Sequence, residues 1–422
     1  MRRFVRTGLL LTAMSLVAVV AAFAAPGKST QGDTLVFAAS SDPTLLDPAL
    51  VSDGESLRVT DQIFESLVGY RPGTTRLQPE LATRWRPSRG GLVWTFTLRR
   101  GVRFHDGTPF NAAAVCFNFE RWYGFPGPLQ NSSVSYYWNT VFGGFKRPAR
   151  GNPGPGKSLY RGCRVVNDTT VQLQLRRRSM SFLNAIALPN FSIASPTALR
   201  TYRADEGRVD AQGVFTPTGT FATRNPVGTG PFRFSSWTPG SRLELVRWDG
   251  YWGAKARLQR LIFRPIANNA ARLQALQTGE IQGYDLVEPA DFATVRRNSN
   301  MRLLKRAPFS VGYVGISQAV EPMDNPLVRQ AVAHGLDKRG VISFYGGQGA
   351  VASQFNPPAL PGYARTGVPS YPYNPARARA LLQRAGLTLP VKITFWYPTD
   401  VSRPYMPDPK RNAEAFGASL ER

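Results

Sequence analysis

Hydrophobic and polar residues alternate strictly between residues 94 and 98, where Trp94, Phe96 and Leu98 are separated by two threonines. A period of two predicts a β-strand with one buried face. Turn-forming residues follow at 105–109, and Asn111 is a candidate N-cap for a helix. Helical spacing then places three large apolar side chains on one face: Val115, Phe119 and Trp122.

Similar signals recur along the rest of the chain. Apolar runs predict further strands at residues 34–39, 165–175, 261–266, 311–316 and 391–397. Amphipathic spacing and cap residues predict helices at 55–67, at 269–278 and after Asn325 and Asn374. Strands that alternate with capped helices indicate an α/β protein. A chain of 422 residues is too long for one ordinary core, so two or three domains are expected.

The N-terminus has the pattern of a secretory signal peptide. Arg2 and Arg3 precede a long apolar run, and Ala22-Phe23-Ala24 supplies a small-residue cleavage site. We expect residues 1–24 to be removed by cleavage near Ala24; the apolar run is also near the lower length limit for an uncleaved anchor. No cysteine adjoins the site to carry a lipid anchor. The prediction is a soluble protein that is periplasmic or freely secreted.

The charge balance of the chain is strongly basic. The 52 Lys and Arg residues outnumber the 27 Asp and Glu residues, which gives a formal net charge of +25, and 44 of the basic residues are arginine. Such a surplus is compatible with a nucleic acid or an anionic membrane surface as partner. The arginines are scattered along the chain rather than gathered in a tail, which favours a compositional bias. We expect no nucleic-acid partner.

Few residues are available for redox, metal or nucleophilic chemistry. Cys116 and Cys163 are the only cysteines, and the sequence leaves open whether they form a disulfide or stay as buried thiols. With only two histidines, they do not make a usual zinc or redox centre. No G-x-S-x-G or H-E-x-x-H pattern occurs. We therefore predict that the protein is not an enzyme and holds no metal or cofactor.

Residues 151–158 match the phosphate-binding pattern G-x-x-x-x-G-K-[ST] letter for letter. That site needs a buried strand before the loop, free backbone amides, and a helix that begins at the lysine. Here Pro153 and Pro155 remove two amides, and the pattern of a strand follows the loop. We interpret this match as a surface loop.

Five motifs together carry a resemblance to a known family. They include W-x-F-x-L-R with F-x-D-G-T-P and, further on, N-P-V-G-T-G-P-F, and they occupy residues 94–109, 225–232, 280–285, 326–339 and 373–386. Because these motifs occur in the order of the family, the chain resembles the extracellular solute-binding proteins of ABC importers, family 5. This family includes oligopeptide-, dipeptide- and nickel-binding proteins. The resemblance extends from about residue 34 to residue 397.

The resemblance implies an α/β fold like that of periplasmic binding proteins, with two lobes, a cleft between them and a peripheral third domain. Lobe I is expected at 25–64 and 190–268, peripheral domain II at 65–189, and lobe III at 269–422. Family members continue well past the last residue of this sequence. We therefore expect a partial sequence whose second ligand-holding lobe is incomplete.

The resemblance also implies a function. The expected protein captures a peptide-like solute by hinge closure and delivers it to a membrane permease, acting as a monomer. Alternatives are a nickel chelate, haem, a sugar or an opine as ligand, or a basic polyanion-binding or sensory protein. Arg403 is either a partner for an anionic ligand group or a solvated loop residue. The candidate ligand-binding residues, for several of which ordinary core packing is an equal alternative, are Asp53, Gly54, Tyr136, Tyr137, Trp138, Thr229, Gly230, Trp396 and Tyr397.

Overall fold

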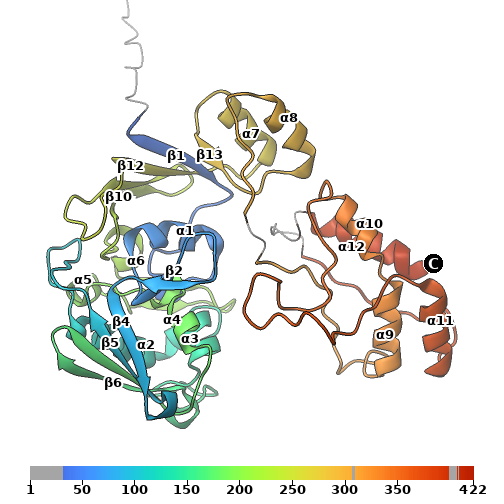
Figure 1. The fold of residues 1–422 in the computed structure, drawn as a ribbon, viewed down its shortest axis with the longest axis horizontal. Coiled ribbons are helices and arrows are strands. Elements are labelled where there is room, and N and C mark those ends of the chain that lie inside the picture. The colour runs from blue at the N-terminus through green and yellow to red at the C-terminus, as the bar shows by residue number, and fades with distance from the viewer. Residues whose placement is uncertain (1–31, 307–308, 399–405, 407) are drawn as a thin grey trace, which may run out of the picture.

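The computed structural model describes residues 32–306, 309–398, 406 and 408–422. It contains an N-terminal body with the β-sheets and a group of C-terminal helices beside it (Figure 1). The predicted signal peptide at 1–24 and Arg403 lie outside the described residues. None of the helices in the described part of the chain has the length and apolar character that crossing a bilayer requires.

The first sheet has five strands in the order β10-β11-β12-β1-β13. β1 pairs in parallel with β12 and β13, whereas β11 pairs antiparallel with both β10 and β12. Parallel pairs need a long crossover, and the chain between β1 and β12 forms the second sheet. The bounds are Thr34–Ala39 (β1), Phe232–Thr238 (β10), Arg242–Arg247 (β11), Arg260–Pro265 (β12) and Gly283–Tyr284 (β13).

One hydrophobic core belongs to this first sheet. Helix α1 (Gly54–Ile63) packs here together with α5 (Pro196–Thr201) and α6 (Phe221–Arg224). The buried side chains of this core come from residues 46–64 and 194–263 and include Val59, Ile63, Phe221, Leu245 and Phe263. Helix α7 (Asn269–Gln277) leads into β13, so residues that the sequence placed in the second lobe add a strand to the sheet of the first.

The second sheet has four antiparallel strands in the order β4-β5-β7-β6. One face, which includes Phe96, Val171 and Leu173, is buried, as the alternating sequence predicts. The predicted helix after Asn111 is α2 (Ala112–Tyr123), which packs against β6 and β7. The strand bounds are Ala82–Ser88 (β4), Val93–Leu98 (β5), Tyr160–Asn167 (β6) and Thr170–Leu175 (β7).

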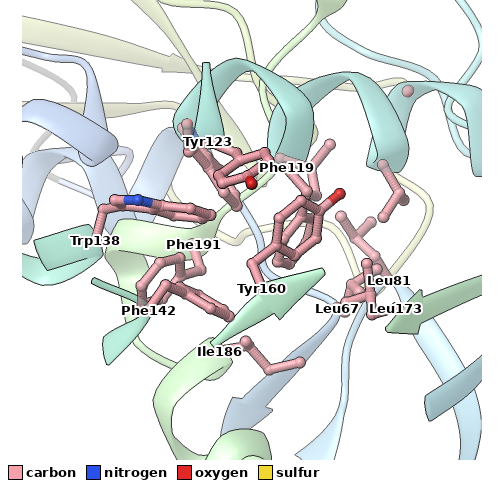
Figure 2. Packing of buried hydrophobic residues seen from close by; sticks show 14 of the residues in the cluster. Leu67, Leu81, Phe119, Tyr123, Trp138, Phe142, Tyr160, Leu173, Ile186 and Phe191 are labelled. Atoms are coloured by element: carbon pink, nitrogen blue, oxygen red, sulfur yellow. The ribbon is translucent and has the colours of Figure 1, made fainter. Parts of the chain in front are cut away.

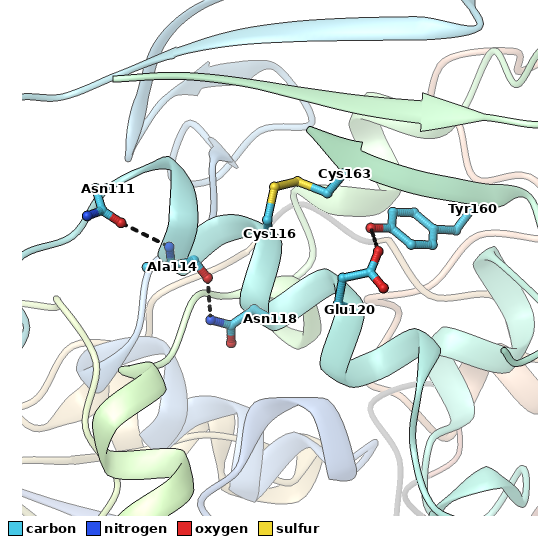
Figure 3. The surroundings of a disulfide bond; sticks show 7 residues. All are labelled: Asn111, Ala114, Cys116, Asn118, Glu120, Tyr160 and Cys163. Carbon is cyan, nitrogen blue, oxygen red and sulfur yellow. Dashed lines mark hydrogen bonds between the residues drawn. A yellow bond between two sulfur atoms is a disulfide. The ribbon is translucent and has the colours of Figure 1, made fainter. Parts of the chain in front are cut away.

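A disulfide joins α2 to the second sheet (Figure 3). Cys116 on α2 and Cys163 on β6 are bonded, with their Cα atoms 5.3 Å apart, so the structure selects the disulfide over two free thiols. At the start of the helix, the Asn111 side chain accepts a hydrogen bond from the backbone N–H of Ala114 at 3.0 Å. The predicted cap therefore satisfies a backbone N–H at the start of α2, and the disulfide attaches the same helix to β6.

A second, largely aromatic core lies between α2 and this sheet (Figure 2). Phe119 and Tyr160 are stacked with ring centroids 5.9 Å apart, and Trp138 and Phe142 are stacked at 4.5 Å. Edge-to-face and stacked ring pairs add to the stabilisation that burial provides. Most of this core comes from residues 67–187, and its smaller helices are α3 (Tyr136–Val141) and α4 (Phe182–Ile186).

Short elements complete the N-terminal body. Two hairpins are formed by β2 (Val68–Tyr70) with β3 (Leu77–Pro79) and by β8 (Gly207–Val209) with β9 (Phe215–Pro217). The loop at 151–158 contains one 3-10 turn, Pro155–Lys157, followed by β6. Since no helix begins at Lys157, this loop lacks the geometry of a phosphate site.

The C-terminal region is helical where it is regular. α9 packs against α11, and α12 packs against α9 and α10. The strands predicted at 311–316 and 391–397 are wrong, because these residues have no strand structure or sheet partner among the described residues. The bounds are Phe292–Arg297 (α8), Pro326–Gly335 (α9), Lys338–Ser343 (α10), Pro375–Arg384 (α11) and Pro409–Glu421 (α12).

Candidate functional site

Two of the family-like motifs pack against each other. The backbone N–H of His105 donates to the carbonyl of Gly228, and its Nε2 donates to the carbonyl of Gly230, both at 2.9 Å. A Cβ atom added to Gly228 would lie 2.2 Å from the carbonyl oxygen of Ile63 at the end of α1. Burial lowers the pKa of His105 to about 4, so its ring is neutral near pH 7. The contact joins the peripheral domain to the first lobe.

The neighbouring Thr229 belongs to a buried hydrogen-bond network. Its hydroxyl, the Tyr251 hydroxyl and the Trp252 indole N–H all donate to the Glu65 carboxylate at 2.8 Å. Thr229 and Gly230 are both buried. These two predicted ligand residues are therefore buried in the interior of the protein. The motif N-P-V-G-T-G-P-F did not indicate which way they face.

The predicted aromatic wall is divided between core and surface. Trp138 is only 2% exposed, and its indole N–H donates to the Gly144 carbonyl at 3.2 Å. Trp138 is therefore a core residue, and almost none of its surface is accessible to a ligand. Tyr136 is 46% exposed and meets Tyr137 edge to face at 5.1 Å. Only these two tyrosines of the three aromatics remain accessible.

The remaining predicted residues lie in two separate places. Asp53 caps α1: its carboxylate accepts from the Ser56 N–H at 2.8 Å and from the Thr44 hydroxyl at 2.9 Å. Gly54 is exposed at the start of the same helix. Trp396 and Tyr397 are 85% and 39% exposed, and no described hydrogen bond or ring contact connects them to lobe I.

A charged cluster lies at the carboxyl ends of β1 and β13. Ser40 follows β1 and donates from its N–H and its hydroxyl to Glu55. Arg58 bonds Glu55 at 3.0 Å and Asp285 at 2.8 Å, and Asp285 also accepts from Arg306 at 3.2 Å. Ligands of open α/β sheets bind outside the carboxyl ends of parallel strands. This cluster is therefore the candidate site at the edge of the first sheet.

The two arginines of the charged cluster differ in how firmly they are held. Burial alone would lower the pKa of Arg58, but its ion pairs with Asp285 and Glu55 outweigh burial and raise that pKa. Arg58 also lies 4.9 Å from the centre of the Phe37 ring. The Arg306 side chain, in contrast, is 69% exposed. Arg306 can therefore exchange Asp285 for another anion at little cost.

Sequence reasoning missed the charged cluster. Two signals for it exist in the chain: Glu55 and Arg58 have the spacing of an ion pair on a helix, and Asp285 follows directly after a strand. Neither signal by itself indicates that α1 and β13 meet. Within the described residues, no group of three or more His, Cys, Asp or Glu side chains has the arrangement of a metal site.

The fold and this site define a two-lobe α/β binding protein, and comparison with known proteins specifies its family. The family model "Bacterial extracellular solute-binding proteins, family 5 Middle" matches residues 76–421. The dipeptide-binding protein of Escherichia coli is 32% identical over 421 residues, which cover 98% of this chain and 73% of that protein. The chain belongs to the bacterial extracellular solute-binding proteins of family 5.

Other relatives bind different solutes. Heme-binding protein A of Haemophilus influenzae is 31% identical over 399 residues, 93% of this chain and 69% of that protein. A solved structure of the ABC transporter-associated periplasmic binding protein DppA from Helicobacter pylori, in complex with the peptide STSA, is 30% identical. It superposes with a TM-score of 0.69 over 84% of this chain and 67% of that chain.

These findings confirm the predicted family and the α/β fold with two lobes. They also confirm that the chain is a solute-binding protein rather than an enzyme, because the family consists of binding proteins. Relatives of this kind act outside the cytoplasm, in transport across the membrane.

Proposed function

We propose that the protein is the solute-binding component of an ABC importer and captures a peptide-like solute between its two lobes. The observation that carries the proposal is the match along nearly the whole chain to a dipeptide-binding protein, with a peptide complex among the similar structures. Bound solute favours the closed form of such a protein, and a membrane permease recognises that form.

The charged cluster, at the edge of the first sheet, is the part of the molecule that would recognise the ends of a peptide. A free peptide carries an ammonium and a carboxylate, and the cluster offers carboxylates and guanidinium groups within one hydrogen-bonded set. In this proposal, Arg306 leaves Asp285 to bind the solute carboxylate, while Arg58 stays in place. Asp53 and Gly54 border the site, and Trp396 and Tyr397 approach it from lobe III on closure.

The proposal also includes the oligomeric state of the protein, its location and the boundary between its lobes. The chain acts as a monomer in the periplasm after signal-peptide cleavage near Ala24, and it binds no nucleic acid. The pairing of β13 with β1 supports a lobe boundary after Tyr284 rather than at residue 269. Closure would then turn about the segment that begins at Asp285.

A thermal-shift panel tests the proposed function. The full chain is heated with dipeptides, tetrapeptides, glutathione, haem and a nickel–histidine chelate, each well above its expected dissociation constant. A peptide is expected to raise the melting temperature, since ligand at about 100 times its dissociation constant adds about 2.7 kcal/mol of stability. A shift with haem or the chelate and none with any peptide would replace the peptide by that ligand.

The proposed role of Arg306 is tested with a matched pair of variants. Arg306→Gln removes an exposed ion pair of 3.2 Å, and Arg203→Gln removes a similar one of 3.3 Å with Glu206 on the surface. We expect Arg306→Gln to weaken peptide binding by about tenfold, because a charge-assisted hydrogen bond is lost. Arg203→Gln should bind as the parent does. Equal affinity in all three proteins would remove Arg306 from the site.

A further inference from the structure

The four-stranded sheet of the peripheral domain leaves one face open to solvent. Most side chains that face away from the aromatic core are polar, and the strand register aligns them in rows. One row crosses the whole sheet and runs from Arg86 on β4 through Thr95 and Gln172 to Arg164 on β6. An arginine therefore stands at each end of a row of short polar side chains.

This open face is cationic without compensating acids. Arg84, Arg86 and Arg164 are exposed, and none of them forms an ion pair with another described residue. None of the four strands contains an aspartate or glutamate, and the acid nearest along the chain, Asp168, lies in the turn between β6 and β7. Three unpaired arginines of the basic surplus thus lie on one face of this sheet.

A hollow at one end of the open face is lined by two further arginines. It has a volume of about 370 Å³, and its lining includes Thr83, Thr97, Arg99, Arg100 and Trp252. The guanidinium of Arg99 lies 4.0 Å from the centre of the Trp252 ring, which orients it. Hydroxyl groups and guanidinium groups together are suited to phosphate oxygens.

We propose that the open face of the β4-β5-β7-β6 sheet binds the anionic phospholipid headgroups of a bilayer. Charge complementarity supports this occupant, since basic side chains near an anionic membrane surface each add to the attraction. The choice of a bilayer also rests on the proposed function, because the permease that receives the solute is embedded in one.

The placement of the aromatic side chains favours lipid over nucleic acid. Single-stranded nucleic acid is bound on aromatic platforms, but the tryptophans of this sheet, Trp85 and Trp94, are on the core side and pack against the aromatic core. In Figure 1 the sheet lies at the lower left, whereas α9 to α12 lie at the right. A membrane contact at this sheet leaves the C-terminal helices free to move.

Vesicle co-sedimentation of the full chain, without solute, tests the proposal. The vesicles contain either phosphatidylcholine alone or phosphatidylcholine with 30% phosphatidylglycerol, at low and physiological salt. The test variant is Arg84→Gln/Arg86→Gln/Arg164→Gln. The control is Arg208→Gln/Arg377→Gln/Arg379→Gln, which removes the same charge from three exposed arginines that have no described ion pair.

The parent is expected to bind only the anionic vesicles, and more weakly as salt rises. Each arginine at the surface is worth about fivefold in partitioning, so the test variant should lose about a hundredfold and the control far less. Equal loss in both variants would show that net charge alone acts, and the proposal would fail. It would fail equally if the parent did not bind, or if it bound single-stranded DNA and no vesicle.

One outcome separates lipid binding from protection of the sheet edges. Arginine on an edge strand also prevents pairing with other chains. If that is its only task, the test variant would sediment with anionic vesicles as the parent does and would aggregate at high concentration. Because no solute is present, failure here leaves the peptide assay unaffected, and loss of peptide binding would leave vesicle binding unaffected.

Discussion

At the residue scale, buried polar groups determine how the peripheral domain meets the first lobe. Glu65 accepts three side-chain hydrogen bonds, and Glu80 lies close enough for the charge of Glu65 to act on it. Burial, and then the charge of Glu65, raise the pKa of Glu80 to about 8, and burial also raises the pKa of Glu65. The folded state therefore holds a proton that the unfolded state releases.

This proton predicts a pH dependence of stability. An unfolded glutamate has a pKa of 4.5, so between about pH 5 and pH 8 the folded protein binds more protons than the unfolded one. The free energy of unfolding should therefore fall as pH rises through this range and level off above it. Glu80→Gln should reduce the slope while keeping an acceptor for the Ser66 N–H. Urea titrations at several pH values measure the slope.

A control for the pH experiment is Glu206→Gln, which alters an exposed ion pair on the surface. This variant should keep the parent slope. If Glu80→Gln also kept the whole slope, another group would account for the pH dependence.

The close approach of Gly228 to α1 predicts a steric effect. Gly228→Ala would place a Cβ atom 2.2 Å from the Ile63 carbonyl oxygen, and the backbone must move to accommodate it. Overpacking of this kind costs about 1–3 kcal/mol of folding free energy. Gly156→Ala is the matched control, since its added Cβ would meet nothing within 4 Å. Equal urea midpoints for the two variants would contradict the tight contact.

Residues of the site were predicted only in part. The cap role of Asn111 follows from local rules that act within a few residues. The burial of Thr229 and the ion pair of Arg58 with Asp285 depend on residues far away in the sequence. A motif specifies residue types, and the side of the fold that each residue faces is determined by tertiary packing.

At the element scale, the disulfide between Cys116 and Cys163, which are 47 residues apart in the sequence, joins α2 to β6. A crosslink across a loop of this length should stabilise the fold by about 2–4 kcal/mol, mainly by restricting the unfolded chain. We expect dithiothreitol to lower the free energy of unfolding of the parent by that amount and thereby to lower its denaturation midpoint. The Cys116→Ala/Cys163→Ala variant should unfold at the lower midpoint with or without reductant. A parent midpoint insensitive to complete reduction would contradict this prediction.

Elements differ in how well local patterns predict them. The helix α2 contains its own cap and apolar face, so its hydrogen bonds are satisfied within one segment. A strand satisfies its hydrogen bonds only through a neighbour, and the runs at 311–316 and 391–397 have no such neighbour in the described structure. Alternation is therefore necessary for a half-buried strand but does not provide its partner.

At the scale of the whole molecule, two binding lobes predict a change of shape with ligand. If a peptide holds the lobes together, small-angle X-ray scattering should show a smaller radius of gyration for the saturated protein than for the free one. Arg306→Gln should need more peptide to reach the same compaction, whereas Arg203→Gln should match the parent. An unchanged radius at saturation would mean that binding occurs without closure.

Fold class and family were predictable from the sequence at this scale, because several motifs occur in a fixed order over most of the chain. The solute was not, because relatives of similar identity are named for a dipeptide and for heme.

The most direct test of the central claim is isothermal titration calorimetry of the full chain with a short peptide that has free termini. We predict saturable binding of one peptide per chain, weakened about tenfold by Arg306→Gln and unchanged by Arg203→Gln. We also predict weaker binding of the same peptide when its carboxyl end is amidated. The absence of saturable binding by di- to pentapeptides, with clear binding of haem or a nickel chelate, would contradict the account.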